Sequence, residues 1–189
     1  MPQNALSNPL VLPILGLLVE QPRHQYGVLS ELRLRYPFLH AKTSTVYTLV
    51  QSLLGNGLVA LDNTAEGSTP TQVTLTPAGV TELRQRVERH LLDTDPSVDP
   101  RFMIALAYLG ILTPRRAIDV LRERAAELRS SRDALTDSLN RPDIRELHMI
   151  EVHFAASRLE HDATWLTRLA QRIKNSELDW PSDHQAAGV

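Results

Sequence analysis

The 189-residue sequence predicts a mainly α-helical protein. We expect an N-terminal domain of three helices, a β-hairpin and a fourth helix, followed by a helical domain with a long antiparallel helix hairpin. Three observations support this fold class. Apolar residues recur at helical spacing through most of the chain. Two β-like runs flank a stretch of turn-forming residues. The acidic, proline-containing segment "DTDPSVDP" at 93–100 interrupts the composition, as an interdomain linker does.

The first three helices are predicted at residues 9–19, 25–36 and 43–55. Asn8 and Pro9 suit the start of the first helix, whose nearly continuous apolar surface predicts that it is buried. Pro37 ends the second helix. The third helix is amphipathic: an apolar stripe lies opposite a polar side. The stripe is Val46, Leu49, Val50, Leu53 and Leu54, and the opposite side is Ser44, Tyr47, Thr48, Gln51 and Gly55.

A β-hairpin follows, with strands predicted at residues 58–62 and 71–76. The connecting "NTAEGSTP" is rich in turn-forming residues. Thr76 can cap a fourth helix that has Pro77 at its first position and ends near residue 92. We therefore predict a domain over residues 1–92, a linker over 93–100, a helical domain over 101–180 and a flexible tail over 181–189.

The C-terminal domain is predicted to contain a helix over residues 102–112 and two longer heptad-like helices joined by the turn "NRP". The last helix carries one stripe from Val152 to Ile173 and a second, beside it, from Leu147 to Leu169. One hairpin partner cannot cover both stripes. Another part of the chain could cover the remainder, but we favour a second subunit. The residues predicted for dimerisation are Ile150, Phe154, His161, Trp165, Leu166, Leu169 and Ile173.

Composition excludes several classes of protein. The absence of cysteine excludes disulfides, thiol catalysis and thiolate metal sites, and it fits a cytoplasmic protein. The apolar run at residues 9–19 has about half of the roughly 20 residues that a membrane span needs. His148, His153 and His161 lack the spacing of a metal site, and no nucleophile-elbow, P-loop or dinucleotide motif is present. We therefore expect no enzyme activity, metal, cofactor or membrane association.

Three helices, a hairpin and a further helix are the layout of a winged helix-turn-helix domain, whose third helix enters the DNA major groove. The residues also resemble a family, the PadR-like transcriptional regulators. The resemblance lies in "ILGLLVEQPRHQYGVLSELR" at 14–33, "TSTVYTLVQSLLGNGLV" at 43–59 and "VTLTPAGVTEL" at 73–83. These pieces cover about the first 90 residues. The remainder resembles, more loosely, the longer subclass that has a C-terminal dimerisation domain.

The resemblance implies a homodimer that binds a pseudo-palindromic operator in double-stranded DNA, usually as a repressor. It also implies that a small molecule or another signal releases the protein from the DNA. Lys42 and Arg23 are candidates for phosphate contacts, and Gln51 could pair with adenine. Thr45, Thr48 and Gln51 could instead form a solvated face. The predicted DNA-binding residues are Arg23, His24, Tyr26, Lys42, Thr43, Ser44, Thr45, Tyr47, Thr48 and Gln51, with Asn63, Thr64, Ser68 and Thr69 in the wing.

The sequence departs from the family pattern in its charge. The wing has no lysine or arginine but contains Asp62 and Glu66. Residues 1–76 carry four positive and four negative side chains, so their net charge is zero. The alternative function is therefore a helical interaction or ligand-sensing module with weak or no DNA binding. An effector pocket lined by Phe102, Tyr108, Phe154 or Trp165 is one interpretation of the aromatic residues, and a packed core is the other.

Overall fold

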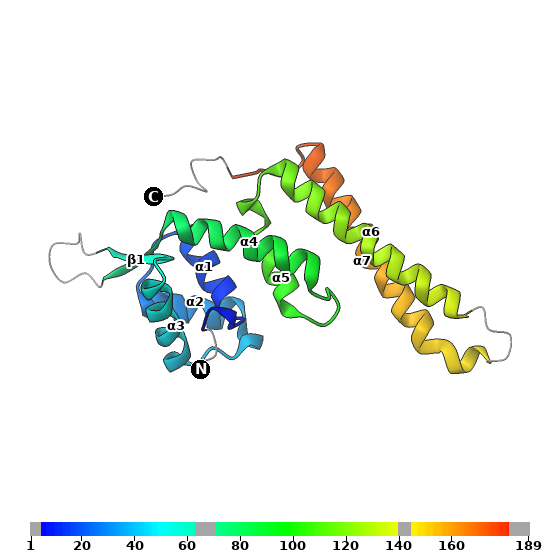
Figure 1. Ribbon diagram of the computed structural model, residues 1–189, viewed down its shortest axis with the longest axis horizontal. Helices are drawn as coiled ribbons and strands as arrows, with labels where there is room; N and C mark the ends of the chain where they lie inside the picture. The colour runs from blue at the N-terminus through cyan, green and yellow to red at the C-terminus, as the bar shows by residue number, and fades with distance from the viewer. Residues whose placement is uncertain (1–4, 63–70, 140–144, 182–189) are drawn as a thin grey trace. The chain divides into compact units, whose positions relative to one another are not determined.

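The computed structural model describes residues 5–62, 71–139 and 145–181. It confirms the predicted fold class: a helical protein with one small antiparallel sheet and a long helix hairpin (Figure 1). The described residues group into two compact units. The first combines those of Met1–Val87 with Ile104–Ile111 and Pro181, and the second combines Glu88–Met103 with Leu112–Trp180.

The first unit is built around α1 (Val11–Glu20), which is buried along nearly its whole length, as its apolar sequence predicts. The helix begins two residues after Pro9, because Asn8 Oδ1 accepts a hydrogen bond from the Leu10 N–H at 2.9 Å and holds the preceding turn. Before it lies the short 3-10 helix η1 (Ala5–Ser7). Buried Leu29 of α2 and Val50 of α3 belong to the same core.

The helix-turn-helix consists of α2 (Gln25–Arg35), the 3-10 turn η2 (Pro37–Leu39) and α3 (Thr43–Gly55). The bounds of α3 agree with the prediction. Gly57, at φ +68°, reverses the chain after α3, a backbone conformation in which glycine is not strained. The amide of Leu58 then donates to the carbonyl of Leu53 at 3.0 Å and closes the helix end.

The wing is a two-stranded antiparallel sheet of β1 (Val59–Asp62) and β2 (Gln72–Leu75), in which Val59 pairs with Leu75 and Asp62 with Gln72. The first helical turn of α4 (Pro77–Asp93) is attached to this sheet through Thr76. The Thr76 hydroxyl donates to the Gly57 carbonyl at 2.7 Å and accepts from the Gly79 N–H at 3.1 Å. The side chain that follows β2 therefore joins the turn after α3 to the start of α4.

The predicted helix over residues 102–112 is wrong in its extent. The structure has α5 (Pro100–Ala107) followed by the 3-10 turn η3 (Leu109–Ile111). Asp99 begins α5 by accepting from the Arg101 N–H at 2.9 Å. The hairpin consists of α6 (Pro114–Leu139) and α7 (Ile150–Lys174), preceded by the 3-10 turn η4 (Glu146–Met149). The two long helices run side by side (Figure 1).

The hairpin core follows the first predicted stripe. Leu121, Ala125 and Leu128 of α6 are buried, as are Ala163 and Leu166 of α7. Polar bonds flank this seam: Arg132 pairs with Glu160, and Arg129 Nη2 donates to Thr167 Oγ1 at 2.7 Å. The predicted boundaries at residues 92 and 100 remain a proposal about which parts fold independently.

Candidate nucleic-acid interface

The outer face of α3 is a continuous polar surface. Val46, Leu49, Val50 and Leu53 are buried, which turns the opposite side of the helix outward. That side consists mainly of residues with hydrogen-bonding side chains and contains no acidic group. Thr45 is half-buried at its edge; the exposed members are Lys42, Thr43, Ser44, Tyr47, Thr48 and Gln51. Seven of the ten predicted DNA-binding residues thus lie on one surface.

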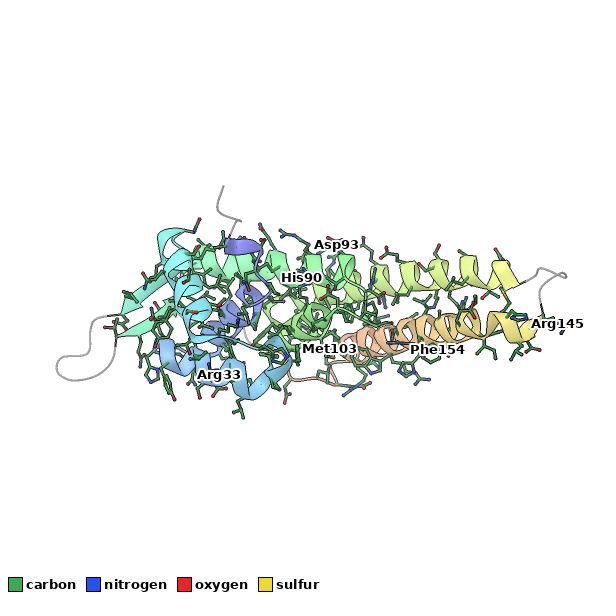
Figure 2. The ribbon with its side chains drawn as sticks, turned by 90° about the horizontal axis from the view of Figure 1, so that it is seen from below. Arg33, His90, Asp93, Met103, Arg145 and Phe154 are labelled. Atoms are coloured by element: carbon green, nitrogen blue, oxygen red, sulfur yellow. The ribbon has the colours of Figure 1, made fainter. Side chains whose placement is uncertain are left out.

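The front end of this surface is positively charged. Lys42 is the residue before α3, and its side chain accepts no hydrogen bond from the first N–H groups of the helix. Arg33 projects from the last turn of α2 (Figure 2). Its Nε donates to the Ala41 carbonyl at 3.2 Å and its Nη2 to Thr43 Oγ1 at 3.2 Å. The guanidinium is therefore held beside the amino end of α3.

Arg33 is not one of the ten residues predicted for DNA binding; the sequence indicated it only as one of several cations that a dimer could bring close to the DNA backbone. Its position in the last turn of α2 gives a usable signal, since basic side chains in a last helical turn interact with terminal carbonyls. Here the carbonyl belongs to Ala41, in the turn between the helices. Only the folded turn brings Ala41 and Thr43 to this guanidinium.

Arg23 does not join the α3 surface as a free cation. Its Nη2 lies 3.3 Å from Glu20 Oε2 and its Nη1 lies 3.7 Å from Glu31 Oε1, with only 13% of the side chain exposed. Arg35 closes the ring by contacting the same two carboxylates at 2.6 and 2.8 Å. The hydrogen bond to Glu20 raises the pKa of Arg35. Two arginines and two glutamates thus compensate each other's charge.

Arg23 instead fixes the wing through its backbone. The Arg23 N–H donates to the Val73 carbonyl at 3.1 Å, and the Val73 N–H donates to the Arg23 carbonyl at 2.8 Å. This bridge holds the turn before α2 against β2. The position predicted for a phosphate contact is therefore an attachment point between the wing and the helix-turn-helix.

His24 and Tyr26 lie at the start of α2. His24 Nδ1 accepts from the Gly27 N–H at 2.7 Å, so the imidazole caps the helix. A Cβ on Gly27 would lie 2.9 Å from the His24 ring, so the glycine provides the room for this cap. Tyr26 is exposed, and its ring centroid lies 6.4 Å from that of His24. The wing residues Asn63, Thr64, Ser68 and Thr69 lie outside the described residues.

The second predicted stripe on α7 is exposed in the single chain. Ile150, Phe154 and Trp165 are 55%, 63% and 47% exposed (Phe154 in Figure 2), and Leu147 precedes them in η4. His161 is also exposed and Leu169 is half-buried. Leu166 and Ile173 differ: they are buried in the hairpin, as members of the first stripe. Those two support the hairpin of a single chain and do not present a surface to a partner.

The aromatic residues considered for an effector pocket are also divided between buried and exposed positions. Phe102 and Tyr108 are buried core residues. Burial also raises the pKa of the Tyr108 phenol. In the described parts of the chain, no cluster of three histidine or acidic side chains could hold a metal ion. Nor does any helix there combine the length and apolar character needed to cross a membrane.

Comparison with known proteins finds a similarity in the N-terminal region. Residues 14–85 match the model of the transcriptional regulator PadR-like family. A comparison with curated proteins finds no match.

Several solved structures are similar to the chain. Bacillus subtilis PadR in complex with operator DNA is 23% identical, with 87% of this chain and 98% of that chain covered and a TM-score of 0.40. The same protein in complex with p-coumaric acid is 23% identical, with coverages of 88% and 99% and a TM-score of 0.40. A PadR-like transcriptional regulator from Bacillus cereus is 12% identical, with coverages of 88% and 99% and a TM-score of 0.39.

Proposed function

We propose that this chain, whose residues 14–85 match the model of the transcriptional regulator PadR-like family, regulates transcription by binding double-stranded DNA through α3. We further propose that it acts in the cytoplasm as a homodimer on a pseudo-palindromic operator. Its mode of action would be repression, which a small molecule or another signal relieves. The observation that carries the proposal is the polar outer face of α3, opposite a fully apolar inner face.

The side chains on α3 suit different parts of a DNA groove. Gln51 has the amide geometry that pairs with adenine, and the methyl group of Thr48 can meet the thymine methyl. The Thr48 hydroxyl already donates to the Ser44 carbonyl at 2.9 Å, which leaves its methyl group as the more useful contact. Tyr47 is 37% exposed and can reach either a base edge or a phosphate.

In the proposed DNA complex, positively charged side chains flank α3 at one end only. Lys42 and the guanidinium of Arg33 flank the helix N-terminus, where the helix dipole also favours a phosphate. Arg23 and Arg35 are compensated by Glu20 and Glu31. Since counterion release by lysine and arginine dominates nonspecific affinity, we expect weak binding to random DNA and a shallow salt dependence.

A dimer would double the number of contacts between the protein and its operator. Ile150, Phe154 and Trp165 are large apolar residues exposed along one helix, and exposed apolar surface on this scale can mark an interaction site. A two-fold axis at α7 would bury the stripe on both subunits and present two α3 helices to the two half-sites of an operator.

A gel-shift titration of the DNA upstream of the gene tests the proposal, with Tyr47→Ala and Lys42→Ala as the variants. Lys174→Ala is the matched control, since it removes the only other lysine, at the exposed end of α7. We expect Tyr47→Ala and Lys42→Ala each to weaken the shift and Lys174→Ala to leave it unchanged. If a folded, dimeric protein binds no duplex even at low salt, the chain is instead a helical interaction or ligand-sensing module.

A further inference from the structure

A hollow of about 560 Å³ lies between the N-terminal segment and α3, at one edge of the polar face. Ala5, Ser7, Asn8 and Pro9 form one wall, and Ser44, Thr45, Thr48 and Leu49 form the other. None of the described residues that line it is charged or aromatic. Five of the eight described lining residues carry hydrogen-bonding side chains and none is aromatic, whereas sites for small effectors are usually lined mainly by apolar and aromatic groups. This lining suits a polar occupant.

The position of the hollow identifies that occupant if α3 enters a major groove. A helix with side chains is about 10–12 Å wide and the groove about 12 Å, so both flanks of α3 would face sugar–phosphate walls. Successive residues turn by about 100°, which places Thr45 on one flank and Tyr47 on the other. The hollow lies on the Thr45 flank, so the sugar–phosphate strand on that side of the groove would occupy it.

The hydrogen-bonding groups in the hollow suit phosphate oxygens, which only accept. Ser44 is exposed and Thr45 half-buried, and each carries a hydroxyl. Asn8 Oδ1 accepts from the Leu10 N–H at 2.9 Å, so its NH₂ group is the part of the side chain that can donate to a ligand. Thr48 differs, because its hydroxyl donates to the Ser44 carbonyl.

We propose that this hollow holds one sugar–phosphate strand of the bound duplex through uncharged donors from Asn8, Ser44 and Thr45. The proposal rests on the proposed function and extends it to the N-terminal segment, which was not among the parts predicted to contact DNA. It also explains how a domain with little positive charge would bind DNA. Hydroxyl and amide donors position a phosphate without the counterion release that makes binding depend on salt.

Fluorescence anisotropy over a salt series tests this, with full-length protein and the tightest duplex selected from a random-sequence pool. The variants are Asn8→Ala/Ser44→Ala, Lys42→Ala as the cationic comparison and Ser30→Ala as the control. Ser30 is an exposed serine of α2 that does not line the hollow. We expect the double variant to bind at least about tenfold more weakly, since one charge-assisted hydrogen bond alone has that strength, with an unchanged slope of log K against log salt. Lys42→Ala should reduce the magnitude of that slope by about one, because the variant neutralises one phosphate fewer.

The outcomes separate this inference from the function on which it rests. Binding by the double variant within about twofold of Ser30→Ala overturns the phosphate hollow but leaves DNA binding intact. A weakened double variant whose salt slope also falls overturns it too, because the grip would then be cationic. If unaltered protein binds no selected duplex, both proposals fail. Thermal unfolding of each variant shows whether weaker binding reflects unfolding of the protein.

Discussion

The ring of Tyr108 lies directly against the backbone of Gly16, so that a Cβ on Gly16 would be 2.3 Å from the ring carbons Cε2 and Cζ. The Tyr108 hydroxyl also accepts a hydrogen bond from the Tyr36 hydroxyl at 3.1 Å. Tyr108 comes after the proline-containing segment at residues 93–100, yet it completes the core around α1.

Gly16→Ala should therefore destabilise the protein even though alanine is the better helix former. Overpacking of a rigid core usually costs about 1–3 kcal/mol, and an aromatic ring held on two sides has little room to move. Urea unfolding followed by circular dichroism measures the loss. Gly55→Ala is the matched control, since nothing lies within 4 Å of a Cβ there. Equal stability of the two variants would show that Tyr108 yields easily.

A second prediction concerns the domain boundary. A fragment that ends after Leu92 lacks the Tyr108 ring. A fragment that ends after Leu112 retains Ile104–Ile111, including Tyr108 and the hydrogen bond between Tyr108 and Tyr36. Removing a buried aromatic side chain typically costs about 3–5 kcal/mol. We expect the longer fragment to unfold cooperatively at a higher urea concentration. Indistinguishable unfolding curves would instead support the boundary predicted at residue 92.

A third prediction concerns Thr76, whose hydroxyl bonds to both Gly57 and Gly79. Thr76→Val keeps the shape but removes the cap of α4 and the bond to the α3 end. Loss of a helix cap costs about 0.5–2 kcal/mol. Thr76→Ser should recover most of that stability because it restores the hydroxyl. The urea midpoints of the two variants give the comparison, and a serine variant as unstable as the valine variant would count against the hydroxyl.

A fourth prediction concerns acid stability at the start of α5. Arg101 bonds Asp99 and lowers the pKa of that carboxyl, while burial opposes the effect. A carboxyl whose pKa is lower in the folded state adds stability above its unfolded pKa of about 3.9, and that stability disappears as pH falls through the folded value. Asp99→Asn should therefore flatten the fall in unfolding free energy below about pH 4. An unchanged acid limb would show that Asp99 contributes little.

Local sequence patterns predicted the helices and the two faces of α3 well. The apolar spacing from Val46 to Leu53 is set by the helix itself, and α6 leaves most of the second stripe on α7 exposed, as its spacing indicates. These features depend on residues a few positions apart, so periodicity reveals them.

Side-chain partners were predicted less well, because they depend on the conformation of turns and on how separate helices pack. The carboxylates of Glu20 and Glu31 meet Arg23 only after α1 and α2 are packed. His24 has the polarity of a DNA contact, but the conformation of the turn makes it a helix cap. The place of Tyr108 in the first core was equally hidden, since a composition break separates it from Gly16.

The last prediction concerns the exposed stripe on α7. Phe154 is 63% exposed in the single chain, and the Arg158 guanidinium lies 5.8 Å from its ring centroid. If a second subunit covers the stripe, Phe154→Glu places a charge in an apolar interface and should leave a monomer. Leu34→Glu is the matched control: it adds the same charge at an exposed apolar residue of α2. Light scattering gives the molar mass of each variant, and a dimeric Phe154→Glu protein would locate the interface elsewhere. A monomer should also lose affinity for a two-site operator but not for a single half-site, because only the former needs two α3 helices.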